Sequence, residues 1–201
     1  MIRAALFDFG GVILRTEDPT PRLQLAASLG LTVEEIYHLV FNSPSARLAA
    51  TGKVTAAEHM ESVRNALGIS PDEFPVVIAS FWKGDRVDQD LVEYIRELRA
   101  SKKAALLSNA WDDLRSVLEN HWGIINIFDE LIISAEIGIA KPDPRIYQIA
   151  VGRLGVLPGE AVFVDDFIEN VQAARACGLQ AIQFKSYLQM RSDLAMVSEG
   201  L

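Results

Sequence analysis

Short, mostly apolar runs recur along the chain and are separated by segments with helical spacing. They lie at residues 4–7, 104–107, 161–164 and 180–184, and a shorter run lies at 138–140. Apolar runs of this length are typical of strands buried on both faces of a parallel sheet. Alternation of such strands with helices favours a sheet covered by helices on both sides. The predicted fold class is therefore α/β, with a Rossmann-like parallel-sheet core flanked by helices.

The segments between these runs carry the spacing of amphipathic helices. Their predicted buried faces are Leu91/Ile95/Leu98, Ile146/Ile149/Ala150 and Val171/Ala174/Cys177. Asp143–Pro144 is typical of a helix start, because Asp serves as an N-cap and Pro suits the first helical position. Gly178 is placed to end the third of these helices as its C-terminal cap.

Between residues 15 and 85 the alternation stops and the pattern becomes helical, and we call this segment the helical insert. Three sites fit a capping box, in which Ser or Thr caps a helix that carries Glu three residues later: Thr32–Glu35, Thr55–Glu58 and Ser70–Glu73. We predict short, bundled helices with an apolar core of their own. The predicted domains are a core of residues 1–14 and 86–201 and an all-helical insert at 15–85.

Composition and charge narrow the function classes. The 201 residues carry a net charge of −8, and half of them are hydrophobic. This acidic charge argues against binding to nucleic acid or to an anionic membrane surface, because both require a stripe of basic residues to hold their phosphates. The first residues do not resemble a secretory signal, and no stretch approaches the roughly 18 apolar residues of a membrane span. Cys177 is the only cysteine, so no intramolecular disulfide forms. We expect a cytoplasmic protein without nucleic-acid or membrane partners.

Residues with chemical potential stand directly after four of the apolar runs. They are Asp8, Ser108–Asn109, Lys141 and Asp165–Asp166. If all four runs are strands of one parallel sheet, their carboxyl ends share an edge, and these groups converge on Asp8. Mg²⁺ prefers oxygen ligands, and a cation offsets the repulsion between a carboxylate and a phosphate. The pattern indicates a site that handles a phosphate with a divalent metal.

The order Asp, Ser, Lys, Asp–Asp resembles the motifs of the haloacid dehalogenase-like (HAD) hydrolase superfamily, over nearly the whole chain. By this resemblance the helical insert is a cap that closes over the site, and Asp8 is the catalytic nucleophile. The resemblance also implies that Mg²⁺ is held by the Asp8 carboxylate, the backbone carbonyl of Gly10 and Asp166. Asp165 is then an outer acid or an occasional ligand.

The remaining candidates suit the binding of phosphate. Ser108 can donate its hydroxyl hydrogen to a phosphate oxygen, and Asn109 can add its backbone N–H at the start of the next helix. Lys141 would bridge Asp8 and a phosphate oxygen and offset the charge that grows near the nucleophile. A carboxylate nucleophile such as Asp8 would form an aspartyl-phosphate that water then hydrolyses.

One position departs from the family pattern. The first motif usually reads Asp-x-Asp, but this chain has Asp8-Phe9-Gly10, so the acid that protonates the leaving group is missing. Three readings are open. The substrate has a good leaving group, such as a sugar 1-phosphate; Glu17, Asp18 or an acid of the insert replaces the missing one; or turnover is weak. Members with Asp-x-Gly here, including hexose 1-phosphate phosphatases, resemble this chain, which favours the first reading.

Three other functions share part of this pattern. A 2-haloacid dehalogenase would use the same nucleophile on carbon but needs no metal, and the Asp165–Asp166 pair would then be uncompensated like charge. A phospho-accepting receiver module carries its acidic pair before the acceptor, which is the reverse of this order. The loss at Gly10 keeps open a catalytically silent binding protein, but intact Asp8, Ser108, Lys141 and Asp166 argue against it. We predict a Mg²⁺-dependent phosphatase of a small phosphorylated metabolite.

Overall fold

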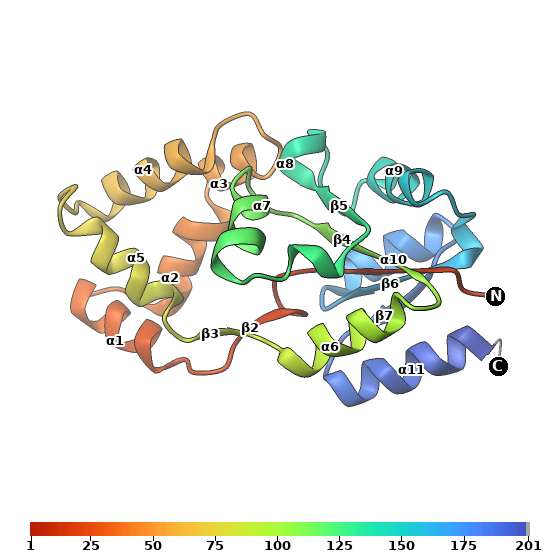
Figure 1. The fold of residues 1–201 in the computed structure, drawn as a ribbon. Helices are drawn as coiled ribbons and strands as arrows, with labels where there is room; N and C mark the ends of the chain where they lie inside the picture. Colours follow the sequence, from red (N-terminus) through yellow and green to blue (C-terminus); the bar gives the residue numbers. More distant parts are fainter. Residues whose placement is uncertain (200–201) are drawn as a thin grey trace.

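A parallel β-sheet forms the centre of the protein. The computed structural model describes residues 1–199. Within them one five-stranded sheet has the order β5-β4-β1-β6-β7 (Figure 1). Its strands are β1 (Ala4–Phe7), β4 (Lys103–Ser108), β5 (Glu130–Ile133), β6 (Ala161–Asp165) and β7 (Gln180–Gln183), and all neighbours run parallel. The predicted α/β class is confirmed, with β1 as the central strand.

Both faces of the sheet are buried, because successive strand residues point to opposite sides. Phe7 belongs to a hydrophobic cluster shared with α6 (Gln89–Leu98) and α11 (Tyr187–Glu199). Leu6 belongs to a second cluster shared with α9 (Pro144–Leu154) and α10 (Ile168–Ala176). The predicted helices that begin at Asp143–Pro144 and carry Val171 therefore cover one face. The connections contain α7 (Leu114–Ser116), η2 (Val117–His121), η3 (Ile125–Ile127), α8 (Ser134–Ile137) and η4 (Pro158–Glu160).

The strand predicted at residues 138–140 is wrong. Gly138 ends the short helix α8 in the left-handed conformation, with φ of +76°, and its N–H donates to the carbonyl of Ser134. Residues 139–140 continue as a loop. One edge strand of the sheet is instead β5, just before α8. Residues 138–140 are thus a helix end followed by a loop, because glycine at position 138 adopts positive φ without a Cβ clash.

The helical insert stands beyond the sheet, at the left of Figure 1. It is entered through β2 (Leu14–Thr16) and left through β3 (Asp85–Val87), which pair antiparallel with each other. The ends of the predicted segment 15–85 thus fall inside this two-stranded ribbon. The helices between them are α1 (Thr20–Leu29), α2 (Val33–Tyr37), η1 (His38–Asn42), α3 (Pro44–Ala49), α4 (Ala56–Leu67) and α5 (Phe74–Trp82). Their apolar faces form a third hydrophobic cluster.

Two of the three predicted capping boxes are confirmed. Thr32 and Thr55 each accept the backbone N–H of the Glu three residues later, and that Glu accepts the N–H of the Thr. Ser70 and Glu73 also bond to each other, but α5 begins only at Phe74 without a side-chain cap. The third box therefore closes a turn before the helix.

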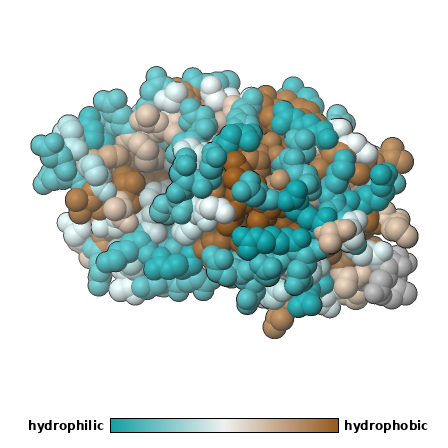
Figure 2. Space-filling model, viewed as in Figure 1, coloured by the Kyte–Doolittle hydropathy of each residue, from teal (hydrophilic) through white to brown (hydrophobic). Residues whose placement is uncertain are grey.

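Hydrophilic residues cover most of the face drawn in Figure 2. Within residues 1–199 no helix is both long and apolar enough to cross a bilayer.

Candidate active site

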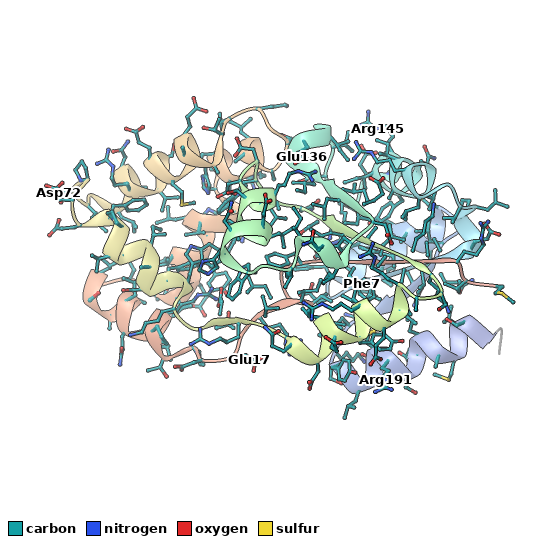
Figure 3. The ribbon with its side chains drawn as sticks, in the orientation of Figure 1. Phe7, Glu17, Asp72, Glu136, Arg145 and Arg191 are labelled. Carbon is teal, nitrogen blue, oxygen red and sulfur yellow. The ribbon has the colours of Figure 1, made fainter. Side chains whose placement is uncertain are left out.

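Asp8 follows the central strand at the carboxyl edge of the sheet. Phe7, its neighbour, lies at the centre of the molecule (Figure 3) and pairs with Leu106 of β4 and Val164 of β6. This register sets Asp8 beside the ends of both strands. Its N–H donates to Val164 O at 2.9 Å, and its Oδ1 accepts the N–H of Phe9 at 2.7 Å. Asp8 Oδ2 is left for other partners, although the side chain is buried.

Lys141 is the main partner of Asp8. Its Nζ lies 2.9 Å from Asp8 Oδ2 and 2.7 Å from Asp165 Oδ2, and the lysine is only 4% exposed. Lys141 reaches this place from the loop after α8 and not from a strand end. Asn109 holds that loop, because its Oδ1 accepts the N–H of Lys141 at 2.7 Å and its Nδ2 donates to the Lys141 carbonyl at 2.9 Å.

The two neighbouring acids after β6 differ in their surroundings. Asp165 is fully buried, and its carboxylate accepts from Lys141 Nζ, from the N–H of Phe167 at 2.8 Å and from Asn170 Nδ2 at 3.1 Å. Asp166 is half-buried, and its Oδ1 has no hydrogen-bond partner within residues 1–199. Asp165 is therefore occupied by the protein, whereas Asp166 keeps a free oxygen.

The three carboxylates form one cluster. Oxygens of Asp8, Asp165 and Asp166 all lie within 4.8 Å of one another. The pKa of Asp8 is raised to about 6: burial has the largest effect and raises it, the positive charge of Lys141 lowers it, and the negative charge of Asp165 raises it. Burial, and then the charge of Asp165, also raise the pKa of Asp166. In both acids burial is the main cause of the raised pKa, and the neighbouring carboxylate of Asp165 adds to it.

Two other predicted residues lie at this cluster: Ser108 acts on Asp8, and Asn109 holds Lys141 with its side chain instead of presenting its N–H at a helix start. Ser108 ends β4 and is buried, and its side chain lowers the pKa of Asp8. No helix begins at Asn109, since α7 starts only at Leu114. Gly10 is exposed, and a Cβ added to it would meet nothing within 4 Å. The missing acid thus leaves open space.

Two functional residues were not predicted. Gly11 has φ of +79°, and a Cβ there would lie 2.2 Å from Asp166 Oδ2, so only glycine lets that carboxylate approach the first loop. Asn170 orients Asp165 from the buried face of α10. The sequence does carry a signal for Asn170, since it is a polar residue on an apolar helix face. A buried amide needs a hydrogen-bond partner, so such a residue indicates a polar contact inside the protein.

The donor set fits Mg²⁺. Three clustered carboxylates against one lysine leave an excess of two negative charges, and Asp166 Oδ1 is an orphaned buried oxygen. Mg²⁺ takes carboxylate and carbonyl oxygens and retains water, so it suits a half-open cluster of this kind.

The parallel sheet with a carboxylate–lysine cluster at its carboxyl edge defines an α/β enzyme of the doubly wound class. The family model described as haloacid dehalogenase-like hydrolase matches residues 2–178. The chain therefore belongs to the haloacid dehalogenase-like hydrolases.

Curated relatives align along nearly the full chain. A D-ribitol-5-phosphate phosphatase of Bacteroides thetaiotaomicron is 27% identical, over 98% of both chains. A sesquiterpene phosphatase of Aspergillus oryzae is 26% identical, over 96% of this chain and 94% of its own. A fructose-1-phosphate phosphatase of Escherichia coli is 25% identical, over 90% of this chain and 95% of its own.

Solved structures share the fold. A HAD family enzyme from Bacteroides thetaiotaomicron, in complex with magnesium and inorganic phosphate, superimposes with a TM-score of 0.75 at 22% identity, over 94% of this chain and 99% of that one. An L-2-haloacid dehalogenase from Xanthobacter autotrophicus superimposes with a TM-score of 0.66 at 23% identity, over 97% of this chain and 83% of that one.

Proposed function

We propose that the protein is a Mg²⁺-dependent phosphatase of a small phosphorylated metabolite, working through an aspartyl-phosphate on Asp8. The main supporting observation is the charge imbalance of the site: within residues 1–199, Lys141 is the one cation paired with the cluster of Asp8, Asp165 and Asp166. A metal-free dehalogenase would leave that imbalance uncompensated. The names of the curated relatives, which are phosphatases, support the same choice.

In this proposal Asp8 attacks phosphorus with the oxygen that Lys141 orients. The bond from phosphorus to the leaving oxygen breaks, and that oxygen takes a proton from solvent. Water then attacks the phosphorus of the aspartyl-phosphate, the bond between the Asp8 oxygen and phosphorus breaks, and inorganic phosphate is released with Asp8 regenerated. The N–H of Phe9 holds the other carboxylate oxygen of Asp8 and keeps its orientation.

The remaining residues bind and neutralise. Asp8, the backbone carbonyl of Gly10 and Asp166 would hold Mg²⁺, with Asp165 as an outer acid that fixes Lys141. When bound, Mg²⁺ neutralises phosphate oxygens so that an anionic nucleophile can approach. Ser108 donates its hydroxyl hydrogen to a phosphate oxygen, and the backbone N–H of Asn109 is a second donor. Lys141 offsets charge on the transferring group.

We further propose that the leaving group needs little protonation, as in a sugar 1-phosphate. Gly10 supplies no acid, and both nearby candidates are engaged elsewhere. Glu17 lies at the lower edge of the molecule in Figure 3 and pairs with Arg15 at 3.2 Å. Asp18 accepts the N–H of Thr20 at 2.9 Å. The helical insert, residues 15–85, acts as the cap that selects this leaving group.

The test is phosphate release from a panel of sugar, nucleotide and aryl monophosphates, with Mg²⁺ and with a chelator. Release that requires Mg²⁺ and is fastest for 1-phosphates and aryl phosphates is expected. Chelator-insensitive activity on 2-haloacids would replace the phosphatase by a dehalogenase. Absence of any turnover, with the purified protein folded, would favour a silent binding protein.

A gain-of-function variant tests the leaving-group idea. Gly10→Asp places a carboxyl group in open space, since an added Cβ meets no atom within 4 Å. General acid catalysis contributes about 10²–10⁴ in rate, and a partial gain of about tenfold in kcat is expected for alkyl phosphates. Aryl phosphates, whose leaving group needs no proton, are the matched control and stay within twofold (roughly) of the parent rate. An equal change for both classes contradicts the proposal.

A further inference from the structure

The loop after β4 makes a direct bond to the helical insert. Asp112 Oδ1 accepts the backbone N–H of Ala56 at 2.8 Å. Ala56 is the first residue of α4, where the helix has free N–H groups and a partial positive charge. A carboxylate of the core thus caps a helix of the insert.

Packing supports the same junction. The Trp111 ring is stacked on Phe41 with centroids 6.2 Å apart, and His59 meets it edge-on at 4.8 Å. Both partners belong to the insert. A Cβ on Gly52 would lie 2.2 Å from the Ala135 carbonyl, so the turn before α4 also touches the core closely. The junction therefore combines a charged hydrogen bond with aromatic contact.

The same short segment reaches the catalytic lysine from its other end. Asn109 binds both the N–H and the carbonyl of Lys141, at 2.7 and 2.9 Å. Between these two ends, the N–H of Ala110 donates to Ser134 Oγ at 3.0 Å. Four consecutive residues, 109–112, thus connect the insert to the backbone of Lys141, whose Nζ lies 2.9 Å from Asp8.

We propose that Asp112 is a positioning residue: by binding the start of α4 it fixes segment 109–112, and Asn109 in turn holds Lys141 against Asp8. Asp112 itself touches no reacting group. The catalytic consequence rests on the proposed phosphatase activity, whereas the positioning of Lys141 does not. The helical insert then contributes to the order of the site as well as covering it.

Three variants and one control test this. Asp112→Ala removes the acceptor, and Asp112→Asn keeps an amide oxygen in its place. Ala56→Pro removes the donor at the first helical position, where Pro is tolerated, and its ring displaces the Asp112 carboxylate from α4. Thr55 before it is already extended with ψ of 162°. Asp113→Asn is the matched control, because it removes an adjacent exposed carboxylate that is not bonded to Ala56.

The readouts are Mg²⁺-dependent hydrolysis of para-nitrophenyl phosphate and hydrogen exchange of the Lys141 amide. Asp112→Ala and Ala56→Pro are each expected to lower kcat about fivefold with KM nearly unchanged, since one charge-assisted bond is lost. The double variant should lower kcat no further than either single variant does, because both changes remove the same contact. The Lys141 amide should exchange faster in both. Asp113→Asn should match the parent protein, and Asp112→Asn should lie between the parent and Asp112→Ala, because its amide oxygen still accepts but without the charge.

The outcomes separate the two proposals. Unchanged exchange at Lys141 in Asp112→Ala and in Ala56→Pro overturns the positioning role, whatever the activity. Faster exchange in a protein that hydrolyses no phosphate ester sustains the positioning role and rejects the phosphatase. A rise in KM with constant kcat also contradicts the proposal, because it would assign Asp112 to uniform substrate binding.

Discussion

Two buried cations in this protein stand in opposite surroundings. In the helical insert, Arg22 is 4% exposed and binds one carboxylate, Asp85, at 2.6 Å. Its other partners are neutral: it donates to Phe81 O at 2.8 Å and to the Thr16 and Tyr37 hydroxyls, and it lies over the Phe81 ring. In the core, Lys141 lies between two carboxylates with a third close by.

The difference lies in charge balance and not in burial. The Arg22–Asp85 pair is neutral as a unit and joins α1 to the β2–β3 ribbon, which is a structural task. The Lys141 cluster carries surplus negative charge, which the fold tolerates only because a cationic ligand compensates it or some acid is protonated. Surplus charge marks a site prepared for a ligand. A buried ion pair alone does not.

The largest effect is expected for Asp8→Asn. Without the nucleophile, turnover should fall by at least about 10⁴-fold, as measured by phosphate release. Folding should be retained and the melting temperature equal or higher, because burial makes the Asp8 charge unfavourable and raises its pKa to about 6. Asp90→Asn, an exposed acid of α6, is the control with normal turnover. Substantial activity in a clean Asp8→Asn preparation would reject Asp8 as nucleophile.

Asp85→Asn tests the neutral Arg22–Asp85 pair of the insert. Removing one partner leaves the Arg22 charge buried and uncompensated, which costs about 3–5 kcal/mol in the free energy of unfolding. Urea denaturation measures it. The double variant Arg22→Met/Asp85→Leu should recover most of the loss, since both charges are then gone. A single-variant loss below about 1 kcal/mol would show that this pair behaves like a surface one.

Asp166→Asn tests whether the surplus negative charge of the Lys141 cluster binds Mg²⁺. Titration calorimetry should show Mg²⁺ affinity reduced at least about tenfold, because an anionic oxygen ligand is lost. For the parent protein, Mg²⁺ at 100 times its Kd should raise the free energy of unfolding by about 2.7 kcal/mol. Asp85→Asn should leave the affinity unchanged. Equal affinities of the parent and Asp166→Asn would remove Asp166 from the metal site.

The smallest expected effect is on the pH dependence of stability and concerns His59, a neutral side chain within the insert. Its Nε2 donates to Val40 O at 2.8 Å and its Nδ1 accepts from Ser45 Oγ at 2.9 Å, and burial lowers its pKa. Its stabilisation is therefore complete above the unfolded value of about 6.5 and declines as pH falls below it. Urea midpoints between pH 7 and 5 measure this, and His59→Gln should flatten that part of the profile. An unchanged profile would exclude His59 as its source.

Local patterns in the sequence determined much of this molecule. Runs of apolar residues predicted the strands that end at Phe7, Ser108 and Asp165, because strands buried on both faces need such runs. Side-chain caps predicted the helix starts after Thr55 and Asp143, because a cap acts within four residues of itself. The site residues at strand ends followed from topology, since parallel strands bring their carboxyl ends to one edge.

Tertiary structure alone decided how those residues are used. Lys141 comes from a loop held by Asn109, and no local pattern reports a bond across 32 residues. The division of tasks between Asp165 and Asp166 depends on the distant Lys141 and on the turn that aims each side chain. The bond of Asp112 to α4 likewise joins residues 56 positions apart. Such contacts depend on the packed positions of whole elements, whereas strands and caps depend on neighbours in the chain.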